Sequence, residues 1–367
     1  MISIRPFEEG DVEDLQKIEA LSPQGDERCA MGVRKEDVIA RYRMYDRWKM
    51  VVAEVDGRVA GWAGWTVKER AGGSERSVYL AEVIVSPEFR RIGVARRLEE
   101  KAEEDARKSG ADHLYLYVYG PNGAARVLFE GLGYSKMAEV RSIAIPTYKR
   151  AKTSERSTGL SVERMKRDEI GPVVELINGY YRGWRPFEPF SPESFESHLS
   201  RIPGYGLENF WVAKEGVVGE ERKRDEGDIV ACAGLWDCST VADFCYAREP
   251  LSWKAMGLVL RSLSRFTKVP KKIVREGEYF RFHYLTDYAF DRRNTAGMEN
   301  LLSHLNNVLL EEGWEYFVAC LEERDPVFPL LKRRQPQIET WHLFAKSLDR
   351  PMPDFSPFYV DIRDMIL

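Results

Sequence analysis

Residues 78–98 read VYLAEVIVSPEFRRIGVARRL, and the rest of the chain is organised around this stretch. The first eight of them, 78–85, are apolar and rich in β-branched side chains apart from Glu82, which predicts a buried strand. From Val94 onward, apolar residues recur every four positions with charged residues between them, which predicts an amphipathic helix. The sequence therefore predicts a strand, a loop that contains Gly93, and a helix.

The loop between this strand and helix is suited to binding an anion. N–H groups at a helix N-terminus lack partners within the helix, and the helix dipole favours negative charge there. Arg90 and Arg91 add positive charge beside it. A Walker loop would need Gly-Lys-Ser/Thr, which is absent, and a dinucleotide fingerprint would need three glycines where only Gly93 is present.

The pattern Arg-x-x-Gly-x-Ala, from Arg90 to Ala95, resembles motif A of the GCN5-related N-acetyltransferases, the GNAT superfamily. An alternating segment at 113–119 and the segment NGAARVLFEGLGY at 122–134 follow in the order found in that family. An ordinary βαβ unit without a ligand is the alternative, and the order of the elements disfavours it. The resemblance implies that the loop holds the pyrophosphate of acetyl-CoA.

The resemblance also implies which residues contact acetyl-CoA. Backbone groups at the end of the strand would meet the thioester and the pantetheine arm, and Asn122 would contact the coenzyme or act as a turn residue. The expected coenzyme-binding residues are Val83, Ile84, Val85, Arg90, Arg91, Ile92, Gly93, Val94, Ala95, Asn122 and Arg126.

Glu82 is the expected general base. Its carboxylate stands in an apolar strand, where burial without a partner would raise its pKa towards neutrality. A structural carboxylate bonded to a neighbouring strand or an arginine is the alternative. Many GNAT enzymes have a tyrosine that protonates the leaving thiolate where this chain has Phe129, and a phenyl ring cannot donate a proton. The proton donor would then be another tyrosine, for which we choose Tyr119, or water. The alternative is that catalysis has been lost. A row of tyrosines on a strand also suits packing.

Composition limits the remaining possibilities. The 367 residues carry a net charge of −4, and 44% of them are hydrophobic and 31% charged, which describes a soluble globular protein long enough for two domains. The negative charge disfavours nucleic-acid binding, and no apolar run is long enough to span a membrane. Five scattered cysteines lack metal-binding spacing. We therefore expect a cytoplasmic protein without metal, nucleic-acid or membrane partners.

The plan of the first half recurs in the second. Residues 160–176 repeat the strand and helix of 2–18, and 283–290 match 78–85, with Asp287 where Glu82 stands. We expect an α/β (α+β) fold of two tandem GNAT folds, each a mixed, mostly antiparallel central sheet flanked by helices. The expected parts are a GNAT domain with the acetyl-CoA loop at 1–150, a linker at 151–159 and a degenerate GNAT-like domain at 160–367.

The second half departs from the coenzyme motif. Residues 292–299 keep Gly297 but lose the Arg-x-x-Gly-x-Ala spacing, and Glu299 would compete with a phosphate for the same N–H groups. We therefore expect this half to bind no coenzyme. Elsewhere the sequence predicts a helix over 35–45, a hairpin turn at Asp56-Gly57 and a solvated charged insertion over 216–227.

The resemblance implies a direct acetyl transfer. Acetyl-CoA would serve as co-substrate, and the acceptor would be a primary amine of a small molecule, protein or peptide, with the enzyme a monomer or homodimer. The rival hypothesis is a non-catalytic acyl-CoA-binding or protein-interaction scaffold. Phe129 favours the rival, whereas the intact loop and Glu82 favour the enzyme.

Overall fold

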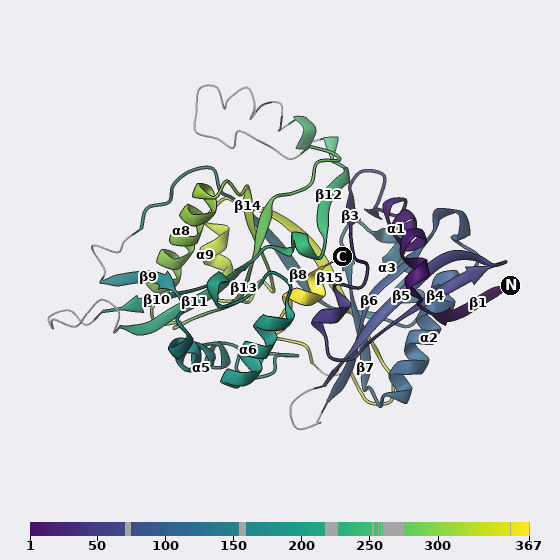
Figure 1. Ribbon diagram of the computed structural model, residues 1–367, viewed down its shortest axis with the longest axis horizontal. Coiled ribbons are helices and arrows are strands. Elements are labelled where there is room, and N and C mark those ends of the chain that lie inside the picture. Colours follow the sequence, from purple (N-terminus) through teal and green to yellow (C-terminus); the bar gives the residue numbers. More distant parts are fainter. Residues whose placement is uncertain are drawn as a thin grey trace.

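The computed structural model describes residues 1–69, 75–153, 159–216, 227–251, 253–255, 257, 259, 275–352 and 354–366. Within these residues the strands form a sheet of twelve and a sheet of three. Figure 1 shows the larger sheet running through the whole molecule, with helices on both of its faces. Most of the predicted charged insertion at 216–227 and part of the predicted linker at 151–159 lie outside the described residues.

The first half of the chain follows the predicted order of strands and helices. Its elements are β1 (Ile2–Pro6), α1 (Val12–Ala20), β2 (Gln24–Gly25), β3 (Ala30–Arg34), β4 (Trp48–Val55), β5 (Arg58–Glu69), β6 (Arg76–Val85), α2 (Val94–Lys108), β7 (His113–Tyr119), α3 (Gly123–Gly131) and β8 (Ser135–Pro146). The hairpin turn between β4 and β5 is confirmed, because Asp56 and Gly57 both have positive φ, as a two-residue type I′ turn requires.

The second half repeats this order. Its elements are β9 (Leu160–Arg164), α5 (Ile170–Tyr180), α6 (Pro192–Arg201), β10 (Phe210–Glu215), β11 (Asp228–Trp236), β12 (Asp243–Arg248), β13 (Phe282–Phe290), α8 (Thr295–Glu311), β14 (Tyr316–Leu321), α9 (Phe328–Lys332) and β15 (Gln337–Ser347). The large sheet is mixed, mostly antiparallel and flanked by helices in both halves, so the predicted fold class is confirmed.

The two halves exchange their last strands. The order in the large sheet is β1-β4-β5-β6-β7-β15-β8-β14-β13-β11-β10-β9. Strand β15, from the end of the chain, pairs antiparallel with both β7 and β8, and β8 pairs in turn with β14. Each half is thus completed by a strand of the other. The division into domains at 1–150 and 160–367 stays a prediction. Strands of the two predicted domains are hydrogen-bonded to one another within one continuous sheet.

Alternating side chains place two cores on opposite faces of the first half. Leu114, Leu116 and Val118 of β7 pack with the apolar side of α2, whereas the tyrosines between them face the other way. Helix α1 packs on the face away from α2, against β5 and β6. The candidate active-site cleft opens along β6 and β7.

The predicted helix over 35–45 is wrong. These residues form turns and one short 3-10 helix, Tyr42–Met44. The reason is tertiary: Lys35, Arg41 and Tyr42 direct their polar ends to one buried carboxylate of β6. In a regular helix Lys35 and Tyr42 would lie on one face about 10 Å apart along the axis, and Arg41 would point to a different face.

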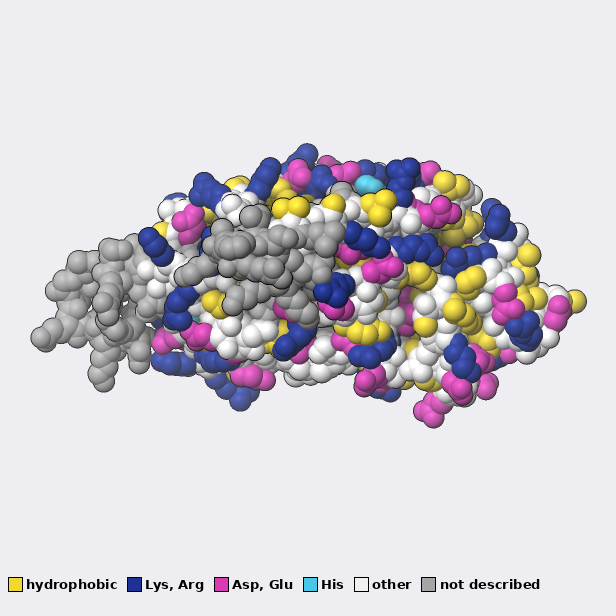
Figure 2. Space-filling view, turned by 90° about the horizontal axis from the view of Figure 1, so that it is seen from above, with side chains coloured by type: hydrophobic (Ala, Val, Ile, Leu, Met, Phe, Trp, Pro, Cys, Tyr) yellow, Lys and Arg dark blue, Asp and Glu magenta, His cyan; other side chains and the backbone are white. Residues whose placement is uncertain are grey.

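The surface mixes charges of both signs. Figure 2 shows Lys and Arg side chains interspersed with Asp and Glu over the visible face of the described residues. Among those residues, no helix combines the length and the apolar character needed to cross a membrane.

Candidate active site

Strands β6 and β7 separate towards their carboxyl ends and leave a cleft. Their parallel pairing covers Ser77 to Tyr79 on one strand and His113 to Tyr115 on the other, although both strands continue further. The cleft beyond is lined by the ends of both strands, the first turn of α2, part of α3 and the segment 364–366. Its empty space, mouth included, is about 1680 Å³.

The N-terminus of α2 opens into this cleft. Gly93 is the N-cap residue with φ of 99°, in the left-handed region that glycine adopts without strain. No side chain caps the helix, and its first turn contains no acidic residue. A Cβ at Gly93 would meet no protein atom within 4 Å, so the backbone conformation, and not crowding by the protein, requires glycine there. The free N–H groups therefore remain available to an anion.

Most of the predicted coenzyme-binding residues lie around this cleft. Those that line it are Val83, Ile84, Val85, Arg90, Arg91, Gly93, Val94, Ala95 and Asn122. Ile92 and Arg126 do not line it, and Ile92 is 53% exposed. The Asn122 side chain accepts a hydrogen bond from the Ala125 N–H at 3.0 Å, so it caps α3, as the turn-residue alternative foresaw.

Glu82 is buried among polar partners. Lys35 donates to Oε1, as does Arg41 at 3.2 Å. The Tyr42 hydroxyl donates to Oε2 at 2.7 Å, and Trp62 Nε1 donates to the same oxygen at 3.2 Å. Within this network the side chains of Lys35 and Arg41 are each 1% exposed.

The expected raised pKa of Glu82 is wrong. Burial alone would raise it, but the charges of Lys35 and Arg41 outweigh burial and lower the pKa to about 2. The carboxylate lines the cleft as expected, yet it is already ionised and paired at neutral pH. This geometry corresponds to the structural alternative considered above.

The three tyrosines of β7 lie on one face of the strand, and their hydroxyls differ in hydrogen bonding. The Tyr115 hydroxyl donates to Asp364 Oδ2 at 2.8 Å, and the Tyr119 hydroxyl donates to Glu339 Oε1 at 3.1 Å. Tyr119 does not line the cleft. Tyr117 does, and its buried hydroxyl has no hydrogen-bond partner among the described residues.

The C-terminal segment contributes a second carboxylate to the cleft. Asp364 is buried, and its Oδ1 accepts hydrogen bonds from the Tyr45 hydroxyl at 2.7 Å and from Lys68 at 2.6 Å. Its backbone carbonyl accepts hydrogen bonds from Arg41 and the Tyr79 hydroxyl, which fixes the segment at the inner end of the cleft. Burial raises the pKa of Asp364. Asp364 lies 285 positions after Tyr79 of β6 and no motif surrounds it, so its place in the cleft could not be predicted from the sequence.

The equivalent helix of the second half is closed to an anion. The Asn294 side chain caps α8 by accepting a hydrogen bond from the Gly297 N–H at 3.2 Å. Gly297 is buried, and a Cβ there would lie 2.7 Å from Val230 Cγ2. The predicted competitor Glu299 pairs with Arg333 at 3.0 Å instead. The side chain that occupies the helix start is therefore Asn294.

The comparisons with known proteins agree with this geometry. Residues 14–134 match the model of the Acetyltransferase (GNAT) family. A search of curated proteins gave no match.

Three solved structures illustrate the likeness. The GCN5-related glucosamine N-acetyltransferase region of a fungal multi-domain GH3 β-N-acetylglucosaminidase has a TM-score of 0.62 at 14% identity, and the match covers 94% of this chain but 38% of that one. A tandem GNAT protein from the clavulanic acid biosynthesis pathway has a TM-score of 0.55 at 13% identity over 95% of this chain and 98% of that one. Saccharomyces cerevisiae N-myristoyltransferase with bound myristoyl-CoA has a TM-score of 0.57 at 12% identity, with 99% and 83% covered.

Identities this low show the fold alone. The family match covers the loop, the helix and the closing segment of the first half, which are the elements that build the cleft. Residues 14–134 thus match the Acetyltransferase (GNAT) family, and the chain has the fold of a tandem GNAT protein.

Proposed function

We propose that the chain is an N-acetyltransferase that uses acetyl-CoA as co-substrate and acetylates a primary amine. The observation that carries the proposal is the uncapped N-terminus of α2 at Gly93, which opens into the same cleft as the end of β6 that no longer pairs with β7. A pyrophosphate at the helix start would meet free N–H groups beside Arg90 and Arg91. The pantetheine arm would then extend along 83–85 between the separated strands.

The reaction needs one proton acceptor and one proton donor. A protonated amine first loses a proton, and its nitrogen then attacks the thioester carbon. The C–N bond forms, the C–S bond breaks, and sulfur leaves with the electron pair. The nitrogen loses a second proton, and one proton returns to sulfur, so the products are the amide, CoA thiol and one released proton.

Two carboxylates among the described lining residues are candidates for the proton acceptor. Glu82, the residue expected from the sequence, has a pKa lowered to about 2, which makes it a weak base. Burial raises the pKa of Asp364, which brings it closer to the range that suits general-base catalysis. We therefore favour Asp364 as the base and keep Glu82 as the alternative.

Tyr117 is our proposed proton donor to the leaving thiolate. The residue lines the cleft, and its hydroxyl is buried and has no partner among the described residues. Tyr119, chosen from the sequence, has its hydroxyl engaged with Glu339 outside the cleft lining. Phe129 lines the cleft and packs edge-on against Tyr134, so it contributes an apolar wall.

The test is release of CoA thiol from acetyl-CoA in the presence of a panel of small amines and amine-bearing peptides. Asp364→Asn should lower kcat more than it raises the KM for acetyl-CoA, and Tyr117→Phe should do the same. Tight binding of acetyl-CoA without transfer to any amine would support the scaffold instead. Absence of acetyl-CoA binding would overturn both hypotheses.

A further inference from the structure

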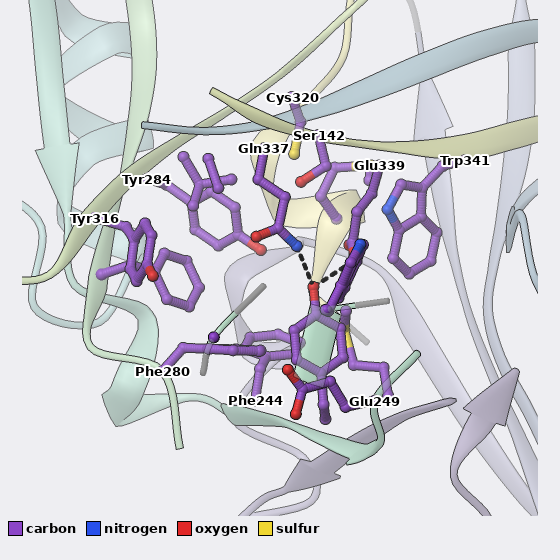
Figure 3. A pocket seen from close by; sticks show the side chains of 18 residues that line it. Ser142, Phe244, Glu249, Phe280, Tyr284, Tyr316, Cys320, Gln337, Glu339 and Trp341 are labelled. Atoms are coloured by element: carbon purple, nitrogen blue, oxygen red, sulfur yellow. Dashed lines mark hydrogen bonds between the residues drawn. The ribbon is translucent and has the colours of Figure 1, made fainter. Parts of the chain in front are cut away.

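An apolar pocket lies between the two sheets, with walls from both halves of the chain (Figure 3). Strands β13, β14, β8 and β15 of the large sheet line one side, and β3 and β12 of the small sheet line the other. Its empty space, mouth included, is about 990 Å³. Trp341 and Met365 line both this pocket and the coenzyme cleft, so the two adjoin.

Aromatic side chains make up much of the wall. They include Phe244, Tyr246, Phe280, Phe282, Tyr284 and Tyr316. Aromatic faces contact an apolar body closely and also attract a cation through their quadrupole. On the strand between β14 and β15, the small residues Ser142 and Ala144 leave the pocket open.

Two carboxylates line this pocket, those of Glu249 and Glu339, and Glu339 is the one bonded to tyrosine hydroxyls. In Figure 3 it lies between Gln337 and Trp341 on β15. The hydroxyls of Tyr119 at 3.1 Å and Tyr246 at 2.5 Å both donate to its Oε1. Among the described residues none donates a hydrogen bond to Oε2, and no Lys or Arg forms an ion pair with Glu339.

Three buried carboxylates elsewhere in the described residues, those of Glu82, Asp325 and Asp361, are better satisfied. Glu82 has Lys35, and Asp361 has Arg363 at 2.7 Å. Asp325, like Glu339, takes hydroxyl donors, but both of its oxygens accept hydrogen bonds. Burial raises the pKa of Glu339, as expected for a carboxylate enclosed by protein without a counter-charge. A cation entering the pocket would supply the missing charge.

We propose that this pocket binds the acetyl acceptor, a primary amine with an aromatic or bulky apolar body, whose ammonium pairs with the Glu339 carboxylate. The assignment rests on the proposed acetyl transfer and names its substrate class. In this proposal acetyl-CoA lies in the cleft on one side of Trp341 and Met365 and the amine in the pocket on the other, and the nitrogen moves from Glu339 to the thioester before transfer. Transfer then follows the proton and bond changes given above.

The first experiment measures binding without turnover. The full chain saturated with CoA is titrated with 2-phenylethylamine and with its neutral analogue 2-phenylethanol, by calorimetry at pH 7. We expect the amine to bind at least tenfold more tightly than the alcohol, because only the ammonium pairs with Glu339. Equal binding of the two, or binding of neither, would overturn the proposal. This comparison uses the unaltered protein and does not depend on a variant folding.

Two variants locate the site. Glu339→Gln should remove the preference for the amine while leaving the affinity for acetyl-CoA unchanged. Glu249→Gln, which makes the same charge change elsewhere in the lining, should keep the preference. Ala144→Leu should weaken both probes by narrowing the pocket. If Glu249→Gln removes the preference and Glu339→Gln does not, the ammonium pairs with the other carboxylate and the proposal falls.

Measurements of acetylation distinguish the proposed acceptor pocket from the proposed acetyltransferase function. Acetylation of polar amines without binding of 2-phenylethylamine would leave the acetyltransferase function standing and overturn the acceptor class. Binding of 2-phenylethylamine without its acetylation would show that the pocket does not serve the acceptor. Binding with acetylation, lost together in Glu339→Gln, is the expected result.

Discussion

Glu82 on β6 and Asp287 on β13 occupy equivalent positions in the two halves. The parallel ladder with the following strand begins at Ser77 in the first half and at Phe282 in the second. Both carboxylates therefore lie the same number of residues after the first residue of the parallel ladder, in the part of the strand beyond the paired residues. The equivalence expected from the order of elements is thus present in the register of the strands.

A tyrosine completes the same arrangement in each half. The Tyr42 hydroxyl donates to Glu82 at 2.7 Å, and the Tyr205 hydroxyl donates to Asp287 at 2.9 Å. Each hydroxyl lies over a glycine, Gly64 or Gly234, where a Cβ would come within about 2 Å of it. A feature shared by a half with the coenzyme motif and a half without it is best explained by folding. This favours a structural role for Glu82.

Replacement of Glu82 by Gln should destabilise the protein. The change leaves Arg41 buried without its carboxylate and Lys35 with Glu19 alone, and breaking a buried ion pair in this way costs about 3–5 kcal/mol. Urea unfolding at pH 7 measures it. The control is Glu88→Gln, which breaks an exposed pair with Arg58 and should cost less than about 1 kcal/mol. Equal effects of the two changes would contradict the structural role.

The contribution of Glu82 should also depend on pH. Its pKa is about 2 in the folded protein and 4.5 is the ordinary value, so the unfolded chain binds more protons between these pH values. The stabilisation is complete above pH 4.5 and is lost as the pH falls towards 2. The difference in unfolding free energy between the wild type and Glu82→Gln should therefore shrink from pH 5 to pH 2.5. A constant difference would mean that the carboxylate is not held ionised.

The sequence predicted what local pattern controls. Apolar runs and four-residue spacing predicted β6 and α2, and Asp56-Gly57 predicted its turn. It did not predict that β8 and β15 exchange places, because alternating apolar and polar residues predict a strand but not the strand with which it pairs. Nor did it predict how Lys35 and Arg41 fold back on Glu82, since a long-range ion pair decided the local conformation there. The same limit hid Asp364 and Glu339, whose partners are distant in the chain.

One acetyl-CoA should bind per chain. Only α2, of the two equivalent helices, begins without a side-chain cap, because Asn294 occupies the start of α8. Calorimetry on the full chain should give a stoichiometry of one. The isolated segment 160–367 is an unsuitable test, because it would lack β8, which lies between its β14 and β15. Two equivalent sites on the full chain would refute the prediction.

The halves should remain joined after the chain is cut between them. A protease site placed within 151–159 would separate β8 from β9, but β15 would still pair with β7 and β8 of the first fragment. We expect the cut protein to elute at the size of the intact chain and to separate only in denaturant. Elution as two folded fragments would show that the exchanged strands are not required.

Replacement of Gly93 by Asp should abolish coenzyme binding while leaving the fold intact. The residue is exposed, a Cβ there meets no protein atom within 4 Å, and the carboxylate would stand where the pyrophosphate is expected. We expect the affinity for acetyl-CoA to fall about a hundredfold or more, which corresponds to about 3 kcal/mol. Calorimetry measures the affinity, and thermal unfolding checks that the variant is folded.

The control must separate the added charge from backbone strain. Gly297→Asp, the counterpart in the second half, is unsuitable, since its side chain would collide with Val230 inside the core. Gly313→Asp is better matched, because Gly313 has φ of 79°, close to the 99° of Gly93, and no protein atom within 4 Å of a Cβ. It should carry a similar strain and keep full affinity. If Gly93→Asp also keeps full affinity, the pyrophosphate does not bind at the start of α2, and the coenzyme site must lie elsewhere.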